Sequence, residues 1–63
     1  MNLQNELVGK KIRMVKMSDP YPIEPNTIGE IWGVDDIGQL KVRWENGRSL
    51  SVIPEIDEFE IQD

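Results

Sequence analysis

Residues 34–52 read VDDIGQLKVRWENGRSLSV, and this stretch decides the fold class of the chain. Apolar and polar residues alternate on both sides of a central Asn46-Gly47 pair. The apolar members of the two runs are Leu40, Val42, Trp44, Leu50 and Val52. Alternation with a period of two is typical of strands buried on one face, and Asn-Gly between two such runs is typical of a tight β-hairpin. The stretch therefore predicts two antiparallel strands whose inward side chains are these five residues.

Other short alternating segments lie on both sides of this hairpin. The predicted strands are residues 11–15, 30–35, 39–44, 49–53 and 58–61. Asn2 is expected to cap a short helical turn that Gly9 ends, and Pro54 is expected to end the fourth strand and lead into a single 3₁₀ turn. Gly33 inside the second strand indicates a β-bulge. Together these elements predict a single all-β domain over residues 1–63, a small SH3-like barrel of five antiparallel strands.

The predicted loop after the first strand is unusually long for so short a chain. It spans residues 17–29, MSDPYPIEPNTIG, and its three prolines exclude both a helix and a central strand. Loops of about a dozen residues are often functional. Pro25-Asn26 fits the centre of a tight turn, because Asn tolerates a positive φ.

Composition narrows the possible functions of this chain. Its 63 residues include neither Cys nor His, so disulfides, the usual zinc sites and His-based catalysis are excluded. We expect no metal site, no cofactor and no enzymatic activity. The net charge of −5 disfavours nucleic acid as a partner. The core of so short a chain is small, and the sequence leaves open whether a homo-oligomer adds to its stability. No apolar run reaches membrane length and no signal-peptide pattern is present, so the expected location is cytoplasmic.

The charges are grouped along the chain. Four of the seven basic residues lie in residues 10–16, and five of the twelve acidic residues lie in the last nine positions. In an SH3-like topology the last strand runs beside the first, which would place Glu58 and Glu60 across from Lys11 and Arg13 as favourable cross-strand pairs. The alternative is a specialised acidic binding face.

Five segments of the chain carry a family resemblance. They are residues 15–21 (VKMSDPY), 25–29 (PNTIG), 33–38 (GVDDIG), 42–47 (VRWENG) and 52–57 (VIPEID). In this order they resemble a short, uncharacterised domain family of bacteria, their mobile elements and phages. Its members often carry Gly at the position of Asn26, and both residues accept a positive φ. The resemblance implies an SH3-like barrel and such a source, but no activity and no catalytic residue.

The candidate catalytic groups have simpler structural explanations. Asp35 and Asp36 form a carboxylate pair that could carry out acid–base chemistry or hold Mg²⁺. An Asp shortly before Gly more often hydrogen-bonds its own turn, which is the interpretation preferred here. The serines have no His partner, so no catalytic residue is predicted.

The binding hypothesis concerns the long loop and the strand after it. Tyr21 lies between Pro20 and Pro22, close to Asp19, and Trp32 points outward if Ile31 points inward. Exposed aromatic side chains on rigid elements are typical of protein-binding surfaces, so the first hypothesis is a non-catalytic module that binds a protein or peptide. The opposing interpretation is that Tyr21 packs over the open barrel end and Trp32 covers the bulge.

Two alternative functions remain open. The first is an acidic inhibitor that occupies the nucleic-acid-binding surface of a host or defence protein, suggested by the net charge. The second is a nucleotide or nucleic-acid binder that uses Lys41, Arg43 and Arg48, which are expected to project from the hairpin on the face opposite the core.

Overall fold

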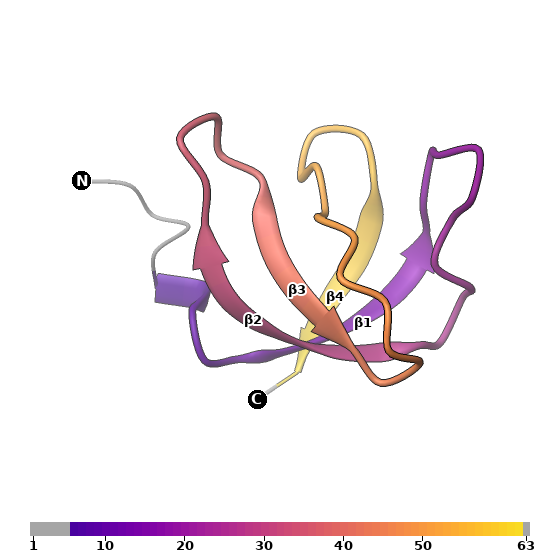
Figure 1. The fold of residues 1–63 in the computed structure, drawn as a ribbon, viewed down its shortest axis with the longest axis horizontal. Helices are drawn as coiled ribbons and strands as arrows, with labels where there is room; N and C mark the ends of the chain where they lie inside the picture. The colour runs from indigo at the N-terminus through magenta and orange to yellow at the C-terminus, as the bar shows by residue number, and fades with distance from the viewer. Residues whose placement is uncertain (1–5, 63) are drawn as a thin grey trace.

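The computed structural model describes residues 6–62, which form a small all-β fold. Its four strands are β1 (Lys11–Lys16), β2 (Ile28–Val34), β3 (Leu40–Trp44) and β4 (Glu58–Gln62). They form one antiparallel sheet in the order β3-β2-β1-β4, and the sheet is strongly curled (Figure 1). The last strand lies beside the first, as predicted. No helix within residues 6–62 is long and apolar enough to cross a membrane.

The core lies on the concave side of the curled sheet. The buried apolar side chains are Ile12, Met14, Met17, Ile23, Ile31, Leu40, Val42, Trp44 and Val52. Within β1 and β3 they occupy alternate positions, so the period of two in the sequence correctly predicted which side chains of these strands point inward. Leu50, the fifth inward residue predicted for the hairpin, is half-buried and packs against this cluster.

Strand β2 carries two local features that shape the sheet. Ile31 lies opposite Val42 and Gly33 lies opposite Lys41, so Trp32 is the extra residue of a β-bulge. The bulge predicted from Gly33 is therefore confirmed. The second feature is Gly29, which packs so closely against β3 that a Cβ there would lie 2.5 Å from Val42 Cγ1.

The predicted fourth strand, residues 49–53, is wrong. This segment contacts β3 through one bridge, in which the N–H groups of Leu40 and Val52 donate to each other's carbonyl oxygens at 2.8 and 2.9 Å. Continuing that ladder would place Leu50 opposite Val42. The indole N–H of Trp44 instead donates to the Leu50 carbonyl at 2.8 Å. The Trp44 side chain therefore occupies the Leu50 carbonyl oxygen, which a continued β3 ladder would use as a hydrogen-bond acceptor. The described part of the chain forms an open four-stranded sheet rather than a five-stranded barrel.

The turns lie at the positions that the sequence predicts, although not all of them are of the predicted type. Asn26 has the positive φ expected of it, 71°, and Gly47 has a φ of 88° in the turn after β3. The structure does not support the 3₁₀ turn predicted before the last strand: the Ile53 carbonyl accepts from the Ile56 N–H at 3.0 Å and, more closely, from the Asp57 N–H at 2.8 Å, which makes this segment a simple hydrogen-bonded turn. The predicted N-terminal helical turn begins at Asn2, outside the described residues. In the described part Glu6 and Leu7 have 3₁₀ conformation and lead into a turn closed by the Lys10 N–H on the Leu7 carbonyl at 3.0 Å, which is too short to support a helix.

Candidate binding site

The loop between β1 and β2 is held in place by side chains. Asp19 Oδ1 accepts a hydrogen bond from the Tyr21 N–H at 2.8 Å, as Asp commonly does in turns. Arg48, just after β3, donates to the loop twice, from Nη2 to the Tyr21 carbonyl at 2.6 Å and from Nη1 to the Pro22 carbonyl at 3.0 Å. Ile23 is buried beneath the loop. The backbone at Tyr21 is thus fixed from two sides.

The Tyr21 side chain itself is free of the core. Its exposed fraction is 79%, the largest among the large hydrophobic side chains of the described residues. The interpretation in which this ring packs over the open end of the sheet is therefore wrong. Pro20 and Pro22 on either side are also exposed.

Trp32 points outward from β2, with 46% of its surface exposed, while Ile31 before it is fully buried. Two cations of β3 lie over its ring: Lys41 Nζ is 5.0 Å and Arg43 Cζ is 5.2 Å from the ring centroid. Both distances are within the range of cation–π attraction. The structure thereby joins Trp32, one residue of the protein-binding hypothesis, with two cations of the nucleotide-binding hypothesis.

Arg48 does not belong to that cationic set. It was expected to project from the hairpin beside Lys41 and Arg43, but its guanidinium is bonded to loop carbonyls. The turn after Trp44 keeps the Arg48 backbone at the end of β3, where the Trp44 N–H donates to the Arg48 carbonyl at 2.9 Å, and only the Arg48 side chain reaches the Pro-rich loop. The predicted three-cation surface is wrong in this respect.

Tyr21 and Trp32 belong to separate surfaces. Their contacts share no residue, since Tyr21 is linked to Asp19 and Arg48, and Trp32 to β3. In Figure 1 the loop of residues 17–27 lies at the right and the hairpin between β2 and β3 at the left.

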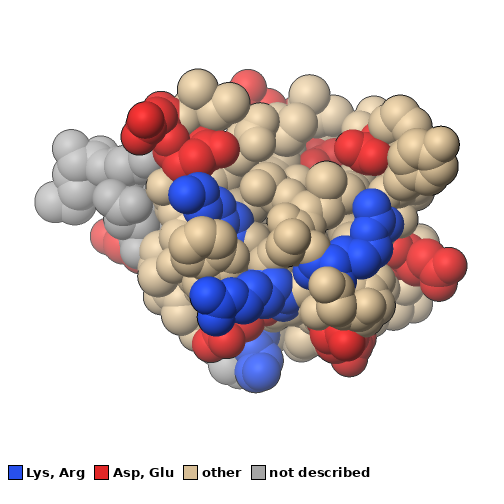
Figure 2. All heavy atoms as spheres, viewed as in Figure 1, with Lys and Arg blue, Asp and Glu red and all other residues tan. Residues whose placement is uncertain are grey.

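The grouped charges are partly explained by cross-strand pairing. Arg13 lies opposite Glu60, and their side chains form an ion pair at 2.6 Å, as predicted. Arg13 Nη1 also donates to Asn26 Oδ1. Lys11 lies opposite Gln62 in the antiparallel register, and Glu58 lies opposite Lys16 because β1 and β4 shift register between Met14 and Lys16. In Figure 2 basic side chains lie across the middle of the face and most acidic side chains lie around its rim.

Comparison with known proteins identifies the family. The family model described as Domain of unknown function (DUF4314) matches residues 4–62. The chain belongs to this family. No curated protein and no solved structure is significantly similar to it. The resemblance to an uncharacterised domain family is confirmed, and the match assigns no activity to the DUF4314 domain.

Two carboxylates of this DUF4314 domain are used by its own backbone. Asp35 Oδ1 accepts hydrogen bonds from the N–H groups of Ile37 and Gln39 at 3.1 and 2.8 Å, which confirms the turn-forming interpretation of Asp35. Asp57, with 6% of its surface exposed, accepts from the Ser18 and Ile53 N–H groups at 2.9 Å each. Sequence reasoning did not single out Asp57. The signal that could have identified it is its position four residues after Ile53, on the other side of Pro54, where a carboxylate can accept from the Ile53 N–H. Within residues 6–62, no group of three carboxylates could hold a metal ion.

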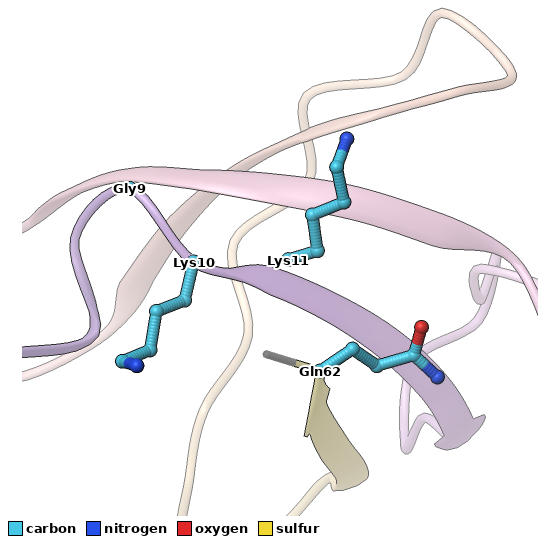
Figure 3. Close-up of a pocket in the computed structure, with 4 residues that line it drawn as sticks. All are labelled: Gly9, Lys10, Lys11 and Gln62. Carbon is cyan, nitrogen blue, oxygen red and sulfur yellow. The ribbon is translucent and has the colours of Figure 1, made fainter.

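A hollow in the described part of the DUF4314 domain lies where the chain enters β1. It measures about 530 Å³ and is lined by Gly9, Lys10, Lys11 and Gln62. Its three long side chains point in different directions (Figure 3). Because no polar groups converge there, this hollow is a weaker candidate than the surfaces of Tyr21 and Trp32.

Proposed function

We propose that this DUF4314 domain is a non-catalytic module that binds a protein or peptide, with Tyr21 as an anchor on its partner. The observation that carries the proposal is the 79% exposure of a Tyr side chain whose backbone is held by Asp19 and Arg48. Large apolar side chains that stand in solvent on a fixed backbone are typical of interfaces.

The energetics of the loop support this role. Binding costs free energy wherever it immobilises mobile groups, and a loop already held by hydrogen bonds and prolines avoids much of that cost. Tyr has only two χ angles to order, contributes a large apolar ring and keeps a hydroxyl for a hydrogen bond. Pro20 and Pro22 restrict the backbone on both sides of the ring.

The proposal includes the finer fold assignment. We regard the sheet as an SH3-like barrel whose fourth strand is reduced to the Leu40–Val52 bridge. The strand order β3-β2-β1-β4 and the return of residues 48–53 toward β3 support this view. SH3-like barrels commonly bind ligands beside the loop after their first strand, which is an argument from fold analogy.

A photo-crosslinking experiment tests the proposal. The crosslinking amino acid p-benzoylphenylalanine replaces Tyr21 in one variant and Ile37 in a matched control, since Ile37 is 77% exposed on the hairpin between β2 and β3. Both variants are irradiated in an extract of the cells that encode the protein. We expect a discrete adduct from position 21 that position 37 does not give.

Affinity measurements with the captured partner complete the test. Tyr21→Ala should weaken binding at least tenfold, whereas Ile37→Ala should leave it unchanged. Identical adducts from both positions, or an unchanged affinity of the Tyr21→Ala variant, would rule the proposal out.

A further inference from the structure

The outer face of β2 and β3 forms a second cluster that the Tyr21 surface does not use. It consists of Trp32, Lys41 and Arg43 and is called here the bulge cluster. In an unbulged ladder each residue of β2 faces one residue of β3, but the bulge sets Trp32 and Gly33 against Lys41 alone. The register of Gly29 to Ile31 already sets Trp32 beside Lys41, and its indole ring lies within cation–π distance of both Lys41 and Arg43.

Gly33 lies beside the side chain of Lys41. A Cβ at Gly33 would lie 3.6 Å from Lys41 Cδ and 4.0 Å from Lys41 Cβ, so the aliphatic stem of Lys41 runs alongside the Gly33 backbone. The stem is thus covered while the ammonium lies over Trp32. The arrangement leaves an apolar ring bordered by two cations on an otherwise acidic chain.

A shallow hollow adjoins the bulge cluster on the same outer face. It measures about 220 Å³, and its lining includes Arg43, Lys11, Glu30 and Glu45. Glu30 lies between the two cations in the sheet, because it is opposite Lys11 on β1 and opposite Arg43 on β3. Glu45 Oε2 accepts a hydrogen bond from the Ile28 N–H at 2.8 Å. Cations and acids therefore alternate here rather than forming a continuous basic stripe.

We propose that the bulge cluster binds a short acidic peptide segment of a protein partner. One or two carboxylates of that segment pair with Lys41 and Arg43, and an apolar side chain beside them packs on the exposed part of Trp32. Charged groups that border an apolar contact give such a surface its specificity. The 220 Å³ hollow next to Arg43 matches a side chain in size and is smaller than usual small-molecule sites.

The charge pattern favours a peptide over nucleic acid. A nucleic acid presents a phosphate at every step and needs several cations in line, whereas Glu30 interrupts the row here. The net charge of −5 would also repel a long polyanion. One or two carboxylates are affected less, because salt screens charges beyond about 8 to 10 Å.

This inference rests on the proposed function in taking the domain to be a protein-binding module, but it concerns a different surface. A random peptide library displayed on phage is selected against the full chain. Peptides enriched in Asp or Glu next to Leu, Ile, Phe or Met are expected. Their affinities are then measured for wild type, Trp32→Ala, Lys41→Gln, Arg43→Gln and Tyr21→Ala. Lys16→Gln serves as the charge-matched control, since Lys16 is an exposed cation outside the cluster.

The expected pattern is specific to the bulge cluster. Trp32→Ala should weaken binding at least tenfold, and Lys41→Gln and Arg43→Gln roughly threefold to tenfold each. Lys16→Gln and Tyr21→Ala should leave the affinity unchanged. A peptide with Gln in place of its acids should lose binding, and titration should shift the indole N–H resonance of Trp32 but not that of Trp44.

Four results would overturn the inference. They are the absence of any enriched peptide, enrichment without an excess of acids, equal loss in the Lys16→Gln variant, and tighter binding of a labelled oligothymidine than of any selected peptide. Peptides that depend on Tyr21 and not on Trp32 would refute this inference and leave the proposed function standing.

Discussion

Arg48 Nη2 donates a hydrogen bond to the carbonyl oxygen of Tyr21 at 2.6 Å, across 27 positions of the chain. Nη1 of the same guanidinium donates to the next carbonyl, that of Pro22, at 3.0 Å. The forked geometry of Arg allows it to reach two adjacent acceptors at once. Arg48 thus joins the turn after β3 to the Pro-rich loop, and the exposed Tyr21 ring owes its fixed position to this link.

The first prediction concerns this link. Arg48→Ala should loosen the loop, because two carbonyls lose their protein donors and water replaces them. The backbone order parameters of residues 19–22, measured by NMR relaxation, should fall, while the free energy of unfolding should drop by only about 1 kcal/mol. Arg48→Lys should restore the order in part, since one ammonium cannot reproduce the fork. Arg43→Ala is the control, and equal loop order in all three variants would contradict the prediction.

The second prediction concerns Asp57, the buried carboxylate between two segments. It accepts from the Ser18 N–H and from the Ile53 N–H, so Asp57→Ala leaves two donors without their acceptor. We expect the free energy of unfolding in urea to fall by roughly 2–4 kcal/mol, because hydrogen bonds to charged groups are worth more than neutral ones. Asp57→Asn keeps one acceptor oxygen and should cost less.

The control for Asp57 lies two residues before it. Glu55 is exposed, and Glu55→Ala should change the free energy of unfolding by less than about 0.5 kcal/mol. If both alanine variants had the same small effect, the buried carboxylate would not be what holds the segment before β4.

The third prediction compares two glycines of β2. A Cβ at Gly29 would lie 2.5 Å from Val42 Cγ1, 2.8 Å from Trp44 Cε3 and 3.0 Å from the Arg43 carbonyl oxygen. The last of these is backbone within the sheet and cannot move without disturbing the β2–β3 ladder. Gly29→Ala should therefore lower the free energy of unfolding by about 1–3 kcal/mol.

Gly33→Ala is the matched variant in the same strand. Its nearest neighbour would be Lys41 Cδ at 3.6 Å, which is an ordinary contact with a flexible side chain. The free energy of unfolding should stay within about 0.5 kcal/mol of wild type, or rise, because Gly is entropically unfavourable in a strand. Equal destabilisation by the two substitutions would show that steric room at Gly29 is not the cause.

Much of this fold could be predicted because it depends on local rules. The alternation of apolar and polar residues places Ile12 and Met14 on the buried face of β1, and it does not depend on contacts with distant residues. A Gly within a strand predicted the bulge, and alternation with an inward Ile31 predicted the outward position of Trp32. A positive φ at Asn26 followed from the turn chemistry of Asn after Pro.

The features that were missed depend on contacts between distant residues. The alternation of residues 49–53 is that of a strand, but the indole N–H of Trp44 competes for the Leu50 carbonyl. The role of Arg48 depends on where its turn meets the Pro-rich loop. That Lys41 and Arg43 lie over Trp32 depends on the register of β2 against β3, which alternation alone does not determine.

The fourth prediction concerns the ion pair of Arg13 and Glu60. Their side chains are 2.6 Å apart, but 28% and 59% of their respective surfaces are exposed, so solvent screens the attraction. A double-mutant cycle with Arg13→Gln and Glu60→Gln should give a coupling free energy below about 1 kcal/mol, and 0.5 M NaCl should reduce it further. Arg13→Gln alone should cost more than Glu60→Gln alone, because Arg13 also bonds Asn26 in the loop before β2. A coupling of several kcal/mol that does not change with salt would instead mean that β1 and β4 are held together mainly by this pair rather than by their backbone ladder and the core beneath it.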